Sequence, residues 1–225
     1  MQSSLEDFGK FFALSFSALL PLVNPLGSAL VFLSMVGVAP RALYRSLAWK
    51  IAVTTTVFLV TIEVIGTAVL KFFGISLPVV QVSGGLALAA MGWSLLNQEQ
   101  AQTKEELAEV DDRAIKSFEQ KIFYPLTFPV TAGPGCIVVL VTLSAHASSK
   151  SVLPDIAAHA GIVAAIVLLS IAVYLCYGFA PAITKRITPQ TAHGVIRVTA
   201  FVVLCIGVQI MWNGIEVLLK TVLKP

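Results

Sequence analysis

Charged residues are scarce in this sequence. Of its 225 residues only 12% are Asp, Glu, Lys or Arg, whereas 57% are hydrophobic, and the mean hydropathy is +0.88. Soluble domains carry roughly a quarter charged residues, so this chain lacks the polar groups that a surface in water requires. Its net charge of +3 is too small and too scattered for nucleic-acid binding. These shortages exclude a cytosolic enzyme, a nucleic-acid binder and a disordered chain, and they leave a protein of the lipid bilayer.

Cysteine is scarce as well. The three cysteines, Cys136, Cys176 and Cys205, each lie in an apolar segment, and the sequence has neither a CxxC motif nor a Cys/His cluster. We therefore interpret them as small buried hydrophobic residues. His159 follows Asp155 by four residues, but no third ligand accompanies this pair. The sequence predicts no metal site, no disulfide and no cofactor.

Long hydrophobic runs make up most of the chain. Thirty residues between Lys10 and Arg41 contain no charge, and the segment 51–70 contains a single one, Glu63. Runs of this kind approach or exceed the ~20 residues that a helix needs to cross a bilayer. Because backbone groups in lipid must pair within their own segment, the runs predict helices. The expected fold is an all-α integral membrane protein with six transmembrane helices, at 9–38, 50–71, 78–97, 122–147, 156–181 and 195–219.

One segment is polar. Residues 98–121 hold 11 of the 27 charged residues and separate a first three-helix unit, 1–97, from a second, 122–225. With both termini outside, ten Lys and Arg residues fall in cytoplasmic loops and five fall outside, which the positive-inside rule favours. We therefore expect a charged cytoplasmic linker and periplasmic termini. Since each half has an odd number of helices, the two halves would form inverted repeats within one membrane domain, an architecture of secondary transporters.

The first helix of each half is interrupted at a corresponding place. Pro21 to Ser28 and Pro129 to Cys136 both bring proline and glycine to mid-membrane depth. Proline ends one helix and suits the first position of the next, so Asn24 is expected to cap a half-helix that begins at Pro25. Thr131 to Gly133 are expected to do the same before Pro134. Ordinary proline kinks are the alternative interpretation.

Half-helix N-termini inside a membrane have a chemical use. Their unpaired N–H groups and partial positive charge attract a carboxylate or another compact anionic or zwitterionic group. Glycine at these places leaves room for a ligand to approach the backbone. In the sixth helix, Gln209 and Asn213 share a face and could bond a ligand, or could simply join helices. The predicted substrate-binding residues are Asn24, Pro25, Gly27, Ser28, Thr131, Ala132, Gly133, Pro134, Gly135, Gln209 and Asn213.

Glu63 is the only carboxylate in the interior of a predicted span. Such residues are costly in a membrane and often line a cavity or relay protons, so Glu63 is our candidate for proton coupling. The alternative is that Glu63 has no role in transport and either pairs with a polar neighbour or reaches the membrane interface.

In the segments of both interruptions, and in several others, the sequence resembles the MarC/SnatA family of six-helix bacterial inner-membrane proteins. The resemblance covers nearly the whole chain, and the most specific motif is the AGPG sequence of 132–135, which follows Pro125-Leu126 and Pro129. Where the family usually has a basic residue before Gly84-Gly85, this chain has Gln81. The resemblance implies transport of small neutral amino acids. Two further segments match, namely Asn24 to Gly27 and Phe73 to Leu77 running into Ser83-Gly84-Gly85. A looser match is Val208-Gln209 with Gly214 in the sixth helix.

These observations together predict a secondary transporter, in uptake or export, of small neutral amino acids in the bacterial inner membrane. The sequence contains no ATP-binding motif, so coupling would be to H⁺ or Na⁺, or transport would be simple facilitation. Rocking of one three-helix half against the other would alternate access to the site. One alternative is a non-transporting scaffold or regulator acting through the linker, which deletion of 100–118 would test. An intramembrane enzyme is a further alternative, but paired interior carboxylates and a GxSG element are lacking, so we expect no enzymatic activity.

Overall fold

The computed structural model describes residues 2–37, 39–97, 121–148, 152–184 and 189–223, and within these ranges it contains helices but no strands. Most of the predicted linker, 98–120, lies outside the described residues. Five stretches are long and apolar enough to cross a bilayer, and a bent pair of helices makes a sixth if it counts as one span. The prediction of an all-helical protein with about six spans is therefore confirmed. In chain order the elements are α1 (Gln2–Val23), α2 (Pro25–Val36), α3 (Arg41–Phe72), α4 (Leu77–Asn97), η1 (Ile122–Thr131), α6 (Pro134–Ala147), α7 (Val152–Gly178), α8 (Ala180–Thr184) and α9 (Pro189–Leu223).

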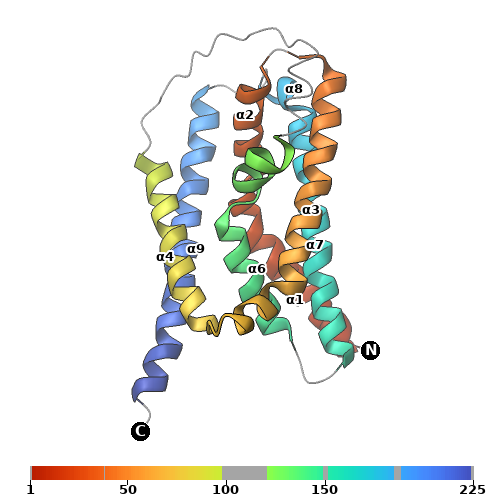
Figure 1. Ribbon diagram of the computed structural model, residues 1–225. Helices are drawn as coiled ribbons and strands as arrows, with labels where there is room; N and C mark the ends of the chain where they lie inside the picture. The colour runs from red at the N-terminus through yellow and green to blue at the C-terminus, as the bar shows by residue number, and fades with distance from the viewer. Residues whose placement is uncertain (1, 38, 98–120, 149–151, 185–188, 224–225) are drawn as a thin grey trace.

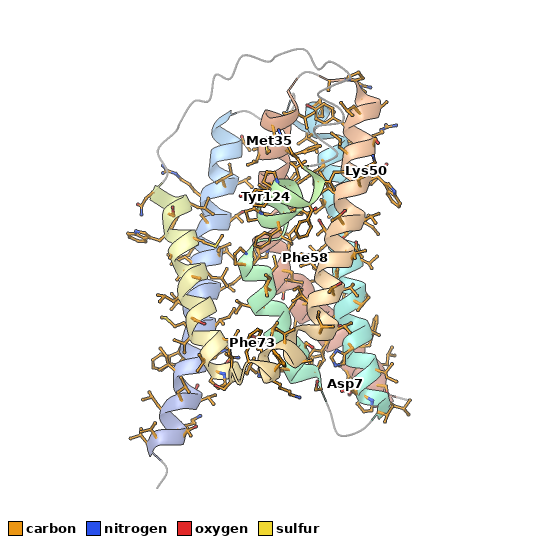
Figure 2. All side chains as sticks on the ribbon, viewed as in Figure 1. Asp7, Met35, Lys50, Phe58, Phe73 and Tyr124 are labelled. Atoms are coloured by element: carbon orange, nitrogen blue, oxygen red, sulfur yellow. The ribbon has the colours of Figure 1, made fainter. Side chains whose placement is uncertain are left out.

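The spans run roughly parallel to one axis, and both chain termini lie at the same end (Figure 1). The interrupted spans α1–α2 and η1–α6 are central, α3 and α7 lie on one side, and α4 and α9 lie together on the other. Charged side chains mark the two ends, with Asp7 near one and Lys50 toward the other (Figure 2). Large apolar side chains such as Trp49, Phe72 and Trp93 are more than 60% exposed, as expected where lipid rather than water surrounds the bundle.

Glycine lets α4 and α9 approach very closely. A Cβ atom on Gly85 would lie 2.4 Å from the backbone nitrogen of Met211, and one on Gly207 would lie 2.4 Å from that of Ala89. Gly92 faces the backbone of Leu204 at 2.6 Å in the same way. Backbone atoms cannot move aside as a side-chain end can, so these glycines fix α4 and α9 as one antiparallel pair.

The two halves of the chain interleave. α1 packs along α7, α3 packs along α7 and α6, and α4 packs along α9, so each of these contacts joins the first half to the second. The buried core follows these contacts, with Leu19, Phe32, Ile51, Leu140 and Ile166 among its fully buried members. The expected rocking of one three-helix half against the other would break these contacts. The α4–α9 pair contacts the remaining helices mainly through α6 and α1.

Candidate functional site

The first interruption is a capped helix start. α1 continues through Pro21 and ends at Val23, and Asn24 then adopts the left-handed conformation, with φ 41° and ψ 65°. Asparagine tolerates this conformation better than most residues. Its Oδ1 atom accepts a hydrogen bond of 3.1 Å from the Gly27 N–H, and Pro25 occupies the first turn of α2. The predicted cap at Asn24 and the helix start at Pro25 are confirmed.

The second interruption is sharper. Tyr124 and Phe128 each precede a proline and are extended, because proline disfavours helical backbone in the residue before it. The η1 segment ends at Thr131, and α6 starts at Pro134 after a bend of 69°. Gly133 is the N-cap and makes no side-chain capping bond. The predicted start at Pro134 is confirmed, but no threonine hydroxyl caps it.

The hydroxyl group of Thr131 joins two elements instead. It donates to the carbonyl of Leu126 at 2.6 Å and lies 2.7 Å from the Tyr177 hydroxyl of α7. Since threonine has a single hydroxyl hydrogen, Tyr177 is the donor in the second bond. The Tyr177 hydroxyl also approaches the Ser28 side chain in the first turn of α2. The Ser28 hydroxyl donates to the Asn24 carbonyl at 2.8 Å. One buried phenol on α7 therefore connects both interruptions.

Aromatic rings support this arrangement. The Tyr177 ring stacks on Phe32 of α2 with a centroid distance of 4.7 Å. Phe58 of α3 packs against Phe123 and Phe128 of η1 at 5.7 and 5.9 Å. Figure 2 shows Phe58 beside the segment that carries Tyr124. The two breaks are thus held by ring packing as well as by hydrogen bonds.

A cavity of about 300 Å³ lies between the two interruptions and the α4–α9 pair. The polar side chains of Asn24 and Ser28 come from the first break, and that of Thr199 comes from α9. The other lining side chains of α4 and α9 are apolar. None of the lining residues that the structure describes carries a charge. The lining residues are Pro21, Leu22, Val23, Asn24, Gly27, Ser28, Val31, Leu88, Met91, Leu95, Pro129, Val130, Gly133, Gly135, Cys136, Ile196, Thr199, Ala200 and Val203.

The structure brings five of the eleven predicted binding residues to this cavity: Asn24, Gly27, Ser28, Gly133 and Gly135. Four others, Pro25, Thr131, Ala132 and Pro134, belong to the same breaks but are not among the lining residues. Gln209 and Asn213 are not brought to the cavity. Both are exposed on α9, and their side chains bond each other at 2.8 Å.

Two glycines of the breaks are crowded. A Cβ on Gly27 would lie 2.2 Å from Asn24 Nδ2, so any side chain there would displace the cap. A Cβ on Gly135 would lie 2.1 Å from Cδ2 of Leu88 on α4. Gly135 lines the cavity from the first turn of α6, where a backbone N–H has no acceptor within the helix.

Thr199 is a lining residue that sequence reasoning missed. Its hydroxyl donates to the Val195 carbonyl at 2.8 Å, which leaves its lone pairs able to accept. A threonine in an apolar helix has no distinctive pattern. It reaches the cavity only because the pairing of α9 with α4 turns this face toward α1 and α2.

Glu63 lies outside this cavity. It is 3% exposed on α3, and its carboxylate contacts Nδ1 of His159 on α7. Among the described residues, no group of three or more His, Cys, Asp or Glu side chains could hold a metal ion.

Comparison with known proteins identifies the family. The model described as "MarC family integral membrane protein" matches residues 9–219. The chain belongs to the MarC family. The protein named "UPF0056 inner membrane protein MarC" from Salmonella typhimurium is 28% identical over 221 residues, which cover 96% of this chain and 99% of that protein. The protein of the same name from Escherichia coli is 26% identical over 220 residues, covering 96% and 98%. No solved structure matches the chain.

MarC family membership also settles the location. The relatives are named inner membrane proteins, and this chain has the apolar helices of a multi-pass protein. It is therefore a multi-pass protein of the inner membrane.

Proposed function

We propose that this MarC family protein is a secondary transporter of small neutral amino acids. The observation that carries the proposal is the position of the cavity, where two interrupted spans meet the α4–α9 pair. Binding at broken helices near the bilayer midplane is characteristic of secondary transporters. The resemblance of the sequence to the MarC/SnatA family supports the same substrate class.

The polar groups of the cavity suit a zwitterion. The start of α6 offers the Gly135 N–H, and the start of α2 offers the amide of Asn24, both with the partial positive charge of a helix N-terminus. These groups would bind the substrate carboxylate. The hydroxyl of Thr199 on the opposite wall would accept a hydrogen bond from the ammonium group.

The rest of the cavity selects for a small, uncharged side chain. A volume of about 300 Å³ is at the lower end for ligand sites, and Leu88, Met91 and Val203 make part of the wall apolar. A charged side chain would find no counter-charge among the described lining residues. Glycine, alanine and serine would therefore be preferred over leucine, glutamate and lysine.

Alternating access would come from movement of the α4–α9 pair. The two halves would be inverted repeats, with α1–α2 corresponding to η1–α6, α3 to α7 and α4 to α9. Because the α4–α9 pair is held together by its glycines, it can move as one body against the group that holds both breaks. The cavity at the boundary would then open to one side of the membrane at a time.

Counterflow in proteoliposomes tests the proposal. Vesicles loaded with unlabelled alanine should accumulate labelled glycine, alanine or serine, and external leucine, glutamate or lysine should compete at least ten-fold less well. Empty liposomes give the background. Counterflow no higher than this background for every labelled amino acid would refute the proposed function.

A further inference from the structure

A buried acid–base pair links α3 to α7. The Glu63 carboxylate is 3% exposed and contacts Nδ1 of His159, whose side chain is 28% exposed. On its other side, Nε2 of His159 lies 3.8 Å from the Asp155 carboxylate, which is 35% exposed. The imidazole therefore lies between a buried carboxylate and a partly exposed one.

We propose that Glu63 and His159 form the proton-binding site of the transporter, a proposal that rests on the transport function proposed above. With one proton, the pair is a carboxylate beside an imidazolium and has no net charge. When the proton leaves through the exposed edge of His159, the carboxylate remains beside a neutral imidazole with one net negative charge. An unpaired buried charge is costly, so the release of the proton favours a rearrangement at this contact.

The partner of Glu63 favours H⁺ over Na⁺. Hard cations take several oxygen ligands, whereas the carboxylate here faces a ring nitrogen. Histidine is also the side chain whose ordinary charge change falls between pH 5 and 8. The geometry is that of a buried proton acceptor, with the partly exposed Asp155 carboxylate on the outer side of His159.

The helices that pack around the Glu63–His159 pair carry other charged groups. α1 crosses α7 where the Phe8 carbonyl approaches Gly161, and this part of α1 carries Glu6, Asp7 and Lys10. α6 carries His146, which is exposed and bonds the Thr142 carbonyl. On α3 itself the next charge is Lys71.

Access is from the end of the bundle at which the chain begins. Asp155 and His159 lie in the first turns of α7, which start at that end (Figure 1). If the termini are periplasmic, as the Lys and Arg distribution predicts, the proton comes from the outside.

α6 connects the pair to the cavity. The Ser144 hydroxyl donates to the Glu63 backbone carbonyl at 3.0 Å, and Val141 packs against Gly66, one turn further along α3. At the other end of the same helix, Gly135 lines the cavity. The nine residue-to-residue steps from Gly135 to Ser144 span about 14 Å of continuous helix. A shift of α3 against α7 is thus transmitted to the donor that would hold the substrate carboxylate.

The test separates exchange from accumulation in proteoliposomes. In Glu63→Gln and His159→Asn, accumulation of labelled alanine driven by an inward proton gradient should fall at least ten-fold, while counterflow should fall no more than three-fold. Glu216→Gln and His146→Asn are matched controls, which change an exposed acid and an exposed imidazole and should leave both activities within two-fold of the unchanged protein. Gradient-driven accumulation by Glu63→Gln equal to that of the unchanged protein would overturn the proposal. So would accumulation driven by a Na⁺ gradient alone and abolished by the same substitution.

A second measurement does not depend on transport. The chain has three histidines, so NMR of histidine-labelled protein in nanodiscs can follow His159 through the signal that is lost in His159→Asn. A proton site requires this signal to change with pH, and Glu63→Gln should alter that change. A His159 signal that does not change with pH refutes the proton site even if counterflow succeeds. A titrating signal without any counterflow refutes the amino-acid transporter and leaves the proton site standing.

Discussion

Gly135→Ala is the substitution that most directly tests the proposed substrate site at the start of α6. The added methyl carbon would lie 2.1 Å from Cδ2 of Leu88, 3.1 Å from its Cγ and 3.5 Å from Cδ2 of Leu22. Carbon atoms in contact are usually about 3.5–4.0 Å apart, so the overlap with Leu88 is well over 1 Å. Because Leu88 is 2% exposed, its side chain can yield only toward the cavity, or by moving α4 away from α6.

The expected cost follows from this overlap. Overpacking of this kind costs about 1–3 kcal/mol. If this free energy opposes closure of the cavity around the substrate, the rate of transport at low substrate concentration falls about 5- to 150-fold. The contact with Leu22 is an ordinary one and adds little. Leu88 alone therefore accounts for the loss.

A compensating substitution makes this prediction specific. Leu88→Ala removes both atoms that the new methyl group would overlap, so in the double variant the methyl group of residue 135 occupies part of the vacated space. Counterflow of labelled alanine is measured for both single variants and the double variant, as a double-mutant cycle. Gly9→Ala is the control, because a Cβ on Gly9 meets nothing within 4 Å.

The double variant should transport at least three-fold faster than Gly135→Ala, and Gly9→Ala should stay within two-fold of the unchanged protein. If Gly135→Ala transports normally, the cavity at the start of α6 is not the substrate site. If the double variant is no faster than Gly135→Ala, the overlap with Leu88 is not the cause of the loss.

Three further substitutions test the packing around the cavity, with thermal unfolding in nanodiscs and counterflow as the measurements. Asn24→Ala removes the cap of α2 and should lower the free energy of unfolding by about 1 kcal/mol, whereas an unchanged stability would contradict the capping bond. Tyr177→Phe keeps the ring stacking and removes only the hydroxyl, so a loss of about 1 kcal/mol is expected, with Tyr174→Phe as a half-buried control that should not reproduce it. Gly207→Ala would place a methyl group 2.4 Å from a backbone atom of α4 and should cost about 1–3 kcal/mol, while Gly194→Ala, in open space on the same helix, should cost nothing.

The spans could be predicted because the bilayer imposes one simple requirement. Every backbone group must be paired along about 30 Å of apolar medium, so a long charge-free run has few alternatives to a helix. The breaks were equally predictable, since proline ends a helix locally: α2 starts at Pro25 and α6 at Pro134 as expected. Local chemistry also identified Asn24 as a cap, because an asparagine directly before a proline has few other uses inside a span.

Contacts between distant segments could not be predicted in this way. The sequence shows Thr131 as a residue suited to capping, yet its hydroxyl bonds Tyr177, forty-six positions away. Gln209 and Asn213 appeared as ligands because they share a face, but that face of α9 is exposed and the two amides satisfy each other. The partner of Glu63 is ninety-six residues along the chain, on a helix whose own pattern gives no sign of it.

The way in which the halves interleave decides which wall of the cavity can move. Tyr177 joins both breaks to α7, and the protonated Glu63–His159 pair holds α3 against α7, so these helices form one unit as long as the pair keeps its proton. The contacts from α4 to this unit are apolar, such as Gly84 against Val138, and such surfaces can slide or separate without leaving a buried polar group unpaired. The donors for a carboxylate therefore belong to the fixed unit, and the apolar wall belongs to the α4–α9 pair. We infer that substrate stays with the two breaks while the α4–α9 pair moves, which requires the glycine contacts of that pair to persist throughout the cycle.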